Sequence, residues 1–162
     1  MSDIWVVNAS PVIALAKAER LHLLSDSCRE LLVPEAVVAE ILAGPPADPA
    51  RQALQRGWGQ TVARPHIPPR LLEWGLGMGE TAVLALAAER KLTAVLDDAA
   101  ARTCAKALGI DVVGTLGVVL RAKRKAIIPS AADVLKALRT AGLYLDDQVV
   151  RTALEGVGEA WE

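Results

Sequence analysis

The sequence predicts an α/β protein: a three-layer α/β/α sandwich with a parallel sheet of four or five short strands, plus helices at the C-terminal end. Short β-branched apolar runs alternate with longer segments rich in alanine and leucine, an order typical of parallel crossover units. Several runs end at polar residues that start helices, as at Asp97 and Asp98. In addition, 52% of the 162 residues are hydrophobic, enough for such a chain to bury most of its surface. We expect one domain over residues 1–162, with a core in 1–125 and a helical end in 130–162.

The first strand is expected at Ile4–Val7, a short apolar run that stops at Asn8. Ser10 and Pro11 follow as N-cap and first helical residue, which predicts a helix through Lys17. Up to residue 70 we then expect a short helical piece at 21–24, a strand at 31–33, a helix at 35–42 that Gly44 ends, a helix at 49–56 and a strand at 61–63. The stretch 44–70 is the least regular, because it holds six of the nine prolines.

Regularity returns after Gly79 and Glu80, which precede a predicted helix at 81–91. Asp97 and Asp98 follow the next strand and cap a helix that runs through Leu108. The remaining expected elements are strands at 92–96 and 110–113 and helices at 115–125, 130–141 and 146–155.

Charge and residue usage exclude several classes of protein. The chain has 18 Lys and Arg residues against 19 Asp and Glu residues, a net charge of −1. This balance argues against a protein that holds nucleic acid by bulk electrostatics, but it allows an enzyme that contacts nucleic acid during catalysis. The two cysteines and two histidines have no zinc-ligand spacing, so any metal is expected on oxygen ligands, as for Mg²⁺ or Mn²⁺. With one tyrosine and no phenylalanine, aromatic platforms for stacked bases are not expected.

No segment predicts membrane insertion or secretion. The longest stretch without charge, 4–16, is interrupted by polar residues and proline and is shorter than the ~18 residues of a membrane helix. The start Met1-Ser2-Asp3 lacks the basic patch of a secretory signal. A cytoplasmic protein is therefore expected.

In open parallel sheets, ligands bind outside the carboxyl ends of the strands, where the strand order reverses. The polar residues expected there include Asn8, Ser10 and Thr115. Asp97 and Asp98 are a sharper signal, because adjacent acids repel each other unless something positive offsets them. Two helical carboxylates, Glu40 and Glu80, are further candidates.

Each of these residues also has a structural interpretation. Glu80 suits the first turn of a helix, Asp98 is a good N-cap with Arg102 four residues on, and Glu40 can lie on a wet helix face. Together, however, the four carboxylates would balance up to two divalent ions. Such a site suits phosphodiester hydrolysis.

Two other patterns are weaker. The glycines between 75 and 79 do not match a nucleotide-binding loop, so we interpret them as a flexible turn before the helix that carries Glu80. Four basic residues in 121–125, Arg121 and Lys123 among them, are typical of a solvated helix end but are also able to contact phosphates.

Five motifs occur in order along the chain: 7–13 (VNASPVI), 33–34 with 38–41 (VP and VAEI), 79–83 (GETAV), 96–102 (LDDAAAR) and 114–117 (GTLG) with Ala122-Lys123. Taken together, they resemble PIN-domain proteins of the DUF3368 branch, which includes toxin-like members of prokaryotic toxin-antitoxin pairs. The resemblance covers roughly the first 125 residues.

The resemblance implies a ribonuclease that depends on Mg²⁺ or Mn²⁺, with acids converging at one sheet edge. Glu40 matches the family's helix glutamate, Glu80 takes the place of its helix-start aspartate, and Asp98, with Asp97 beside it, matches the aspartate after the central strand. Ser10 corresponds to the hydroxyl residue two beyond the first acid, and Thr115 lies near the last metal-facing position. Asn8 departs from the family, which typically has aspartate there, so the site is interpreted as weakened or retuned.

The leading hypothesis is a metal-dependent endoribonuclease whose metal ligands are Asn8, Glu40, Glu80, Asp97 and Asp98. Substrate contacts are expected from Ser10, Arg102, Thr115, Arg121 and Lys123. By resemblance, the partners are an RNA substrate, a small antitoxin protein and a second copy in a homodimer. The alternative is a weakened or inert module that binds RNA or a protein. A phosphoacceptor signalling domain is disfavoured, because Asn8 stands where such a domain needs acids.

Overall fold

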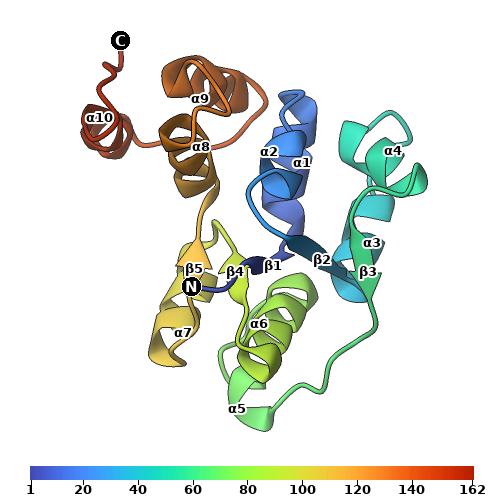
Figure 1. The fold of residues 1–162 in the computed structure, drawn as a ribbon. Coiled ribbons are helices and arrows are strands. Elements are labelled where there is room, and N and C mark those ends of the chain that lie inside the picture. Colours follow the sequence, from blue (N-terminus) through green and yellow to red (C-terminus); the bar gives the residue numbers. More distant parts are fainter.

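The computed structural model describes residues 1–162 and contains five strands and ten helices (Figure 1). The strands are β1 (Ile4–Val7), β2 (Glu30–Pro34), β3 (Gln60–Val62), β4 (Thr93–Val95) and β5 (Val112–Val113). The helices are α1 (Ala9–Lys17), α2 (His22–Ser25), α3 (Glu35–Leu42), α4 (Pro49–Gln55), α5 (Pro69–Leu72), α6 (Met78–Arg90), α7 (Ala99–Ala107), α8 (Thr115–Arg124), α9 (Ala131–Thr140) and α10 (Asp147–Glu155).

The strands form one parallel sheet in the order β3-β2-β1-β4-β5, which confirms the predicted fold class. The register pairs Val6 with Ala94 and Val7 with Val95. The chain builds outward from β1 first through β2 and β3, then returns to add β4 and β5 on the other side. The order therefore reverses between β1 and β4, where a parallel sheet offers a binding crevice.

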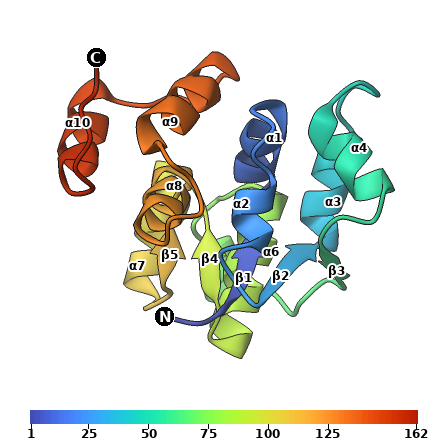
Figure 2. The same cartoon turned by 45° about the horizontal axis from the view of Figure 1, so that its top comes forward.

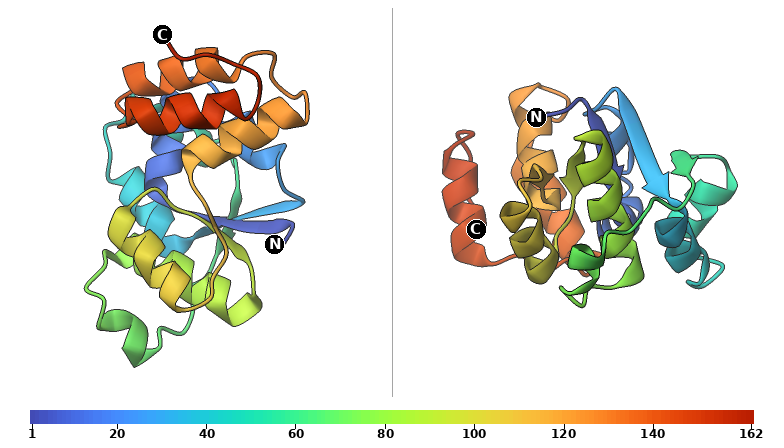
Figure 3. Two further views of the ribbon diagram at one scale, coloured as in Figure 1. Left: turned by 90° about the vertical axis from the view of Figure 1, so that its left-hand side faces the viewer. Right: turned by 90° about the horizontal axis from the view of Figure 1, so that it is seen from below.

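Helices cover both faces of the sheet and make the three layers (Figures 1 and 3). Helices α1, α2, α8 and α9 lie on one face, and α6 and α7 lie on the other. Turned forward, the fold shows α1 standing between the α3–α4 pair and the group formed by α8, α9 and α10 (Figure 2). A cluster of 43 buried residues joins these layers into one hydrophobic core.

Helix α6 is the most deeply buried of the helices. Its residues 81–87 are all buried, because the helix packs against β1, β2 and β4 and is flanked by α3, α5 and α7. A helix that is apolar on nearly every side needs such surroundings. Its first turn, which carries Glu80, is thereby held at a fixed place beside the sheet.

Three local predictions differ from the structure. Ser10 is not an N-cap: Asn8 keeps an extended backbone and donates its N–H to the Val95 carbonyl at 3.1 Å, so α1 begins immediately after it. Pro11 is the third helical residue, which is tolerated because first-turn N–H groups have no partner within the helix. Helix α5, inside the proline-rich stretch, was not predicted, and β5 is two residues long instead of four.

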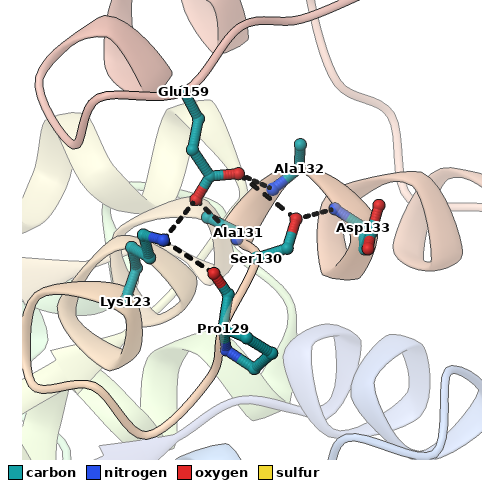
Figure 4. A network of polar contacts seen from close by, with 7 residues as sticks. All are labelled: Lys123, Pro129, Ser130, Ala131, Ala132, Asp133 and Glu159. Carbon is teal, nitrogen blue, oxygen red and sulfur yellow. Dashed lines mark hydrogen bonds and ion pairs between the residues drawn. The ribbon is translucent and has the colours of Figure 1, made fainter.

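The C-terminal helices are fastened to the rest of the chain by a polar network (Figure 4). The Glu159 carboxylate accepts hydrogen bonds from the N–H groups of Ala131 at 2.8 Å and Ala132 at 2.9 Å, at the start of α9. It also accepts from Ser130 Oγ and pairs with Lys123 Nζ at 3.3 Å. Ser130 caps α9 in turn by accepting from the Asp133 N–H.

Trp161 completes the attachment. Its ring is buried, and its Nε1 donates to Asp147 Oδ1 at 2.8 Å. The Arg139 guanidinium stacks over the ring at 4.9 Å from its centroid and pairs with the same Asp147 carboxylate at 2.7 Å. We call Lys123, Ser130, Arg139, Asp147, Glu159 and Trp161 the C-terminal clasp.

None of the chain's helices has both the length and the apolar character required to span a bilayer.

Candidate functional site

Asn8 stands at the centre of the sheet's carboxyl edge, between β1 and α1. The residue is 3% exposed, and its backbone N–H continues the pairing of β1 with β4. Its side-chain oxygen, Oδ1, is buried and has no hydrogen-bond partner, and it does not cap α1. A buried polar atom without a partner costs about 1–3 kcal/mol, a cost that a donor or cation bound beside this oxygen would remove.

Gly79 allows a second oxygen to approach Asn8. A Cβ atom on Gly79 would lie 2.8 Å from Glu40 Oε1 and 3.1 Å from Asn8 Oδ1. The backbone of Gly79 is ordinary helix, so glycine is needed here for space and not for conformation. The missing side chain leaves a small cradle that the two oxygens flank.

Glu40 and Glu80 are the like-charged pair of the site. The pKa of Glu40 is raised, first because its carboxylate loses solvent and second because Glu80 is near. The Glu80 carboxylate folds back over its own helix start, 2.5 Å from the position of a Cβ on Gly77. Glu40 is an exposed residue of α3, yet its Oε1 lies close to Gly79. Nothing positive is paired with either carboxylate.

Asp97 and Asp98 behave differently from the sequence-based expectation that a cation must offset their repulsion. Asp97 accepts hydrogen bonds from the Thr115 N–H at 2.8 Å and from its hydroxyl at 2.6 Å, at the start of α8. Asp98 caps α7 by accepting from the Ala101 N–H at 2.9 Å. Both carboxylates therefore accept hydrogen bonds from the otherwise unpaired N–H groups at the start of a helix, which stabilises their negative charges.

The acids open onto a cavity of about 640 Å³. Ser10 and Lys17 line it from α1, although Lys17 was not predicted as a site residue. Their spacing of seven residues places both on one helix face, a signal the sequence does contain. We call Asn8, Glu40, Glu80, Asp97 and Asp98 the acid edge; all five line this cavity.

A second cavity of about 800 Å³ continues from the first along α7 and α8. The two share Asp97 and the loop residues Leu143 and Tyr144. The predicted substrate residues Arg102 and Arg121 line the second cavity. Gly114 provides the room for Arg102, because a Cβ there would collide with its guanidinium.

Two predicted substrate residues have partners within the chain. Lys123 lines neither cavity; it donates to the Pro129 carbonyl and pairs with Glu159 in the C-terminal clasp. Thr115 is fully buried and bonded to Asp97, so its hydroxyl serves to orient that acid. Arg124, in the same basic run, does line the second cavity.

The acid edge offers oxygen donors of the kind that Mg²⁺ and Mn²⁺ prefer. The unpartnered Asn8 Oδ1 and the raised pKa of Glu40 are both features that a bound cation would relieve. No three Asp, Glu, His or Cys side chains are already drawn together as a ready-made metal site. The donors therefore fit a hard cation in type, from separate places around the cavity.

Comparison with known proteins gives a family. A family model described as DUF3368, PIN domain, matches residues 4–159. No curated protein matches the sequence of this chain. Among solved structures, the fold is similar to that of a PilT N-terminus domain protein from the hyperthermophilic archaeon Sulfolobus solfataricus P2. That protein is 17% identical, with a TM-score of 0.47, over 88% of this chain and 97% of the other.

Proposed function

Because the chain belongs to the DUF3368 family of PIN domains, we propose that it is a metal-dependent endoribonuclease that hydrolyses RNA phosphodiester bonds. PIN domains are generally metal-dependent nucleases. The observation that carries the proposal is the buried, unpartnered Oδ1 of Asn8 beside the Glu40 carboxylate, across the space left by Gly79. Burying the Asn8 oxygen without a partner costs stability, so a role in ligand binding accounts for this arrangement better than a role in folding.

In this proposal, Asn8, Glu40, Glu80 and Asp98 would hold Mg²⁺ or Mn²⁺, with Asp97 beside them. When bound, such an ion stabilises the charge that develops on phosphate oxygens and lowers the pKa of water. In hydrolysis, a water oxygen forms the new bond to phosphorus and gives up a proton, the bond from phosphorus to the leaving sugar oxygen breaks, and that oxygen takes up a proton. The hydroxyl and N–H of Thr115 donate hydrogen bonds to Asp97 and so fix the orientation of its carboxylate beside the ion.

The protein's own cations would place the RNA. Lys17 and Ser10 lie on the cavity wall that α1 provides, and Arg102 and Arg121 line the adjoining cavity. Arginine and lysine contacts to phosphate position a backbone without reading its sequence. The acids are thus flanked by basic side chains on two sides, which would offset the repulsion between RNA and the acid edge.

The proposal includes the role of toxin in a toxin-antitoxin pair, with a small antitoxin protein and a second copy of the chain as partners. Support comes from the family resemblance and from exposed apolar side chains. Leu72 is 61% and Met78 is 72% exposed, and both line a small cavity between α5 and α6. Exposed apolar side chains gathered around one cavity would suit contact with a protein partner.

The test is cleavage of a labelled RNA by the purified chain with Mn²⁺ or Mg²⁺, compared with two variants. Glu40→Gln and Asp98→Asn are each expected to lower the rate of cleavage by about 100-fold, since each replaces a negatively charged ligand of the ion with a neutral amide. Asparagine is also a good N-cap, so Asp98→Asn keeps the start of α7. Glu35→Gln, on the same helix as Glu40 but absent from the cavity lining, is the matched control and should cleave normally.

A second candidate is a PIN-fold module that binds RNA or a protein without cutting it. Two observations favour it: Asn8 brings no charge where PIN nucleases typically have aspartate, and no three acids are preassembled. Calorimetric titration with Mn²⁺ separates the candidates. Saturable binding that Glu40→Gln abolishes supports the nuclease, whereas no binding together with no cleavage supports the inert module.

A further inference from the structure

Tyr144 is the only tyrosine of the chain and is 85% exposed, the most exposed of its large apolar side chains. It lies in the loop between α9 and α10 and lines both cavities, the one at the acid edge and the one along α7 and α8. The expectation that the chain has no aromatic surface for bases was drawn from composition, which does not show where one ring is placed. A single exposed ring is ordinary. A ring at the junction of an acidic and a basic cavity is a specific placement.

The loop that carries Tyr144 is held from both sides. The Leu143 N–H donates to the Leu138 carbonyl at 3.0 Å, and Arg139 donates to the Leu145 carbonyl at 2.6 Å. Asp146 then caps α10 through the Val149 N–H. Since Arg139 also belongs to the C-terminal clasp, it joins the loop that carries Tyr144 to the clasp.

The charges around the ring change sign from one side to the other. Toward α7 and α8 lie Arg102, Arg121 and Arg124. Asp97 and Asp146 line the same cavity, but both are engaged as acceptors at helix starts. Toward α1 lie the acid edge and Lys17. A nucleic-acid backbone laid along the arginines would thus reach the acids by passing the Tyr144 ring.

We propose that Tyr144 is a stacking platform for an unpaired nucleobase next to the scissile phosphate, and that the arginine cavity holds the flanking phosphates. This inference rests on the proposed nuclease function and adds a positioning residue to it. Bases in a duplex are already stacked on each other, whereas unpaired bases are free to stack on an aromatic side chain. Tyr144 is a positioning residue here and takes no part in the chemistry.

Binding is measured by fluorescence anisotropy with a single-stranded RNA of about 12 nucleotides, in EDTA so that no cleavage occurs. Tyr144→Ala should weaken binding about tenfold, and Tyr144→Phe should retain it, because stacking needs the ring and not the hydroxyl. A 2-aminopurine in the RNA, quenched on stacking, should lose its quenching only in Tyr144→Ala. The same sequence in a duplex should bind both variants equally.

The arginine cavity has a matched pair of test variants. Arg124 lines the cavity and its neighbour Lys125 does not, although both are exposed and basic. Arg124→Ala should lower the slope of log affinity against log salt by about 0.7, the value for one phosphate contact on a single strand. Lys125→Ala should leave that slope unchanged.

Equal binding by Tyr144→Ala and the unmodified chain, or no binding by the unmodified chain, overturns this inference. Cleavage with Mn²⁺ is then scored separately. If the RNA is cut but Tyr144→Ala has no effect, the inference fails and the nuclease stands. If binding depends on Tyr144 while no metal supports cleavage, the nuclease fails and the chain is a single-strand binder.

Discussion

The acid edge and the C-terminal clasp use the same kinds of residue in opposite ways. In the clasp, the Glu159 carboxylate has two backbone N–H donors, a hydroxyl and an ammonium group around it. At the acid edge, Asn8 Oδ1 has no partner, and Glu80 contributes to the raised pKa of Glu40 while no cation pairs with either carboxylate. One region satisfies its polar groups, and the other leaves them unsatisfied.

The pKa values of the carboxylates follow this difference. Burial is the largest influence on Glu159 and opposes its charge, but the N–H groups of Ala132 and Ala131 and the Lys123 ammonium together outweigh it, so its pKa is lowered. For Asp147, the Trp161 N–H and then Arg139 lower the pKa. At Glu40, lost solvent and then Glu80 raise it. Stability is thus built into the clasp, while the acid edge keeps an unfavourable charge arrangement that a ligand would relieve.

Gly79→Ala should have the largest effect at the acid edge while leaving the stability of the fold unchanged. The added methyl group would displace the end of Glu40 and press on Asn8 Oδ1, so we expect RNA cleavage to fall about 100-fold. The fold should not weaken, because the displaced atom is a mobile side-chain end and alanine favours helix over glycine by up to about 1 kcal/mol. The measurements are cleavage rate with Mn²⁺ and the melting temperature.

A double variant controls for indirect effects of this change. In a Glu40→Gln background, Gly79→Ala should add little further loss, since residues that act as one unit are not additive. Full activity in Gly79→Ala would show that Glu40 need not approach Asn8 for catalysis.

Asn8→Asp adds a further unpaired negative charge to the acid edge, and so increases its difference from the clasp. The new carboxylate would add a charge at a 3% exposed position already beside Glu40. We expect Mn²⁺ to bind about tenfold more tightly, because a unit charge near a cation is worth several kcal/mol before the cost of lost solvent. The metal-free chain should unfold at a lower urea concentration than the unmodified chain. Calorimetry and urea unfolding measure the two effects, and unchanged Mn²⁺ affinity would exclude Asn8 as a ligand.

Local sequence pattern was enough to predict most of the fold. Five strands separated by helices follow from β-branched runs such as Ile4–Val7, and Asp98 caps α7 as predicted. Helices α9 and α10 lie where helices were predicted, although their N-caps, Ser130 and Asp146, were predicted as the first helical residues. The start of α1 was misplaced, because a sheet hydrogen bond from Asn8 to Val95 decides it. Such a contact, between residues far apart in the chain, leaves no mark in a local pattern.

The sequence predicted acids that prove to line one cavity, but it did not predict how their charges are balanced. Sequence order marked Asp97 and Asp98 as the repelling pair, yet helix starts satisfy both, and the unrelieved pair is Glu40 and Glu80. Their proximity depends on how α3 packs against α6, which spacing does not encode. The place of Tyr144 beside the cavities is not encoded in spacing either, because only the packing of α9 and α10 brings its loop there.

Glu159→Gln should weaken the clasp and leave the acid edge as it is. Because the folded-state pKa of Glu159 is lowered, its stabilising contribution is present above the unfolded value of 4.5 and is lost as pH falls through the folded value. At neutral pH, the variant loses a charge that two N–H groups and Lys123 face. The free energy of unfolding should therefore fall by about 1 kcal/mol.

In urea unfolding, the difference between the two proteins should shrink as pH is lowered below 4.5 and disappear once Glu159 is protonated in the folded state. Glu155→Gln, an exposed residue of α10 outside the clasp, should show no such difference at any pH. Cleavage by Glu159→Gln should stay within a few-fold of normal under folding conditions, because the acid edge does not depend on this charge. A loss of stability that is the same at every pH would mean that Glu159 acts through packing and not through its charge.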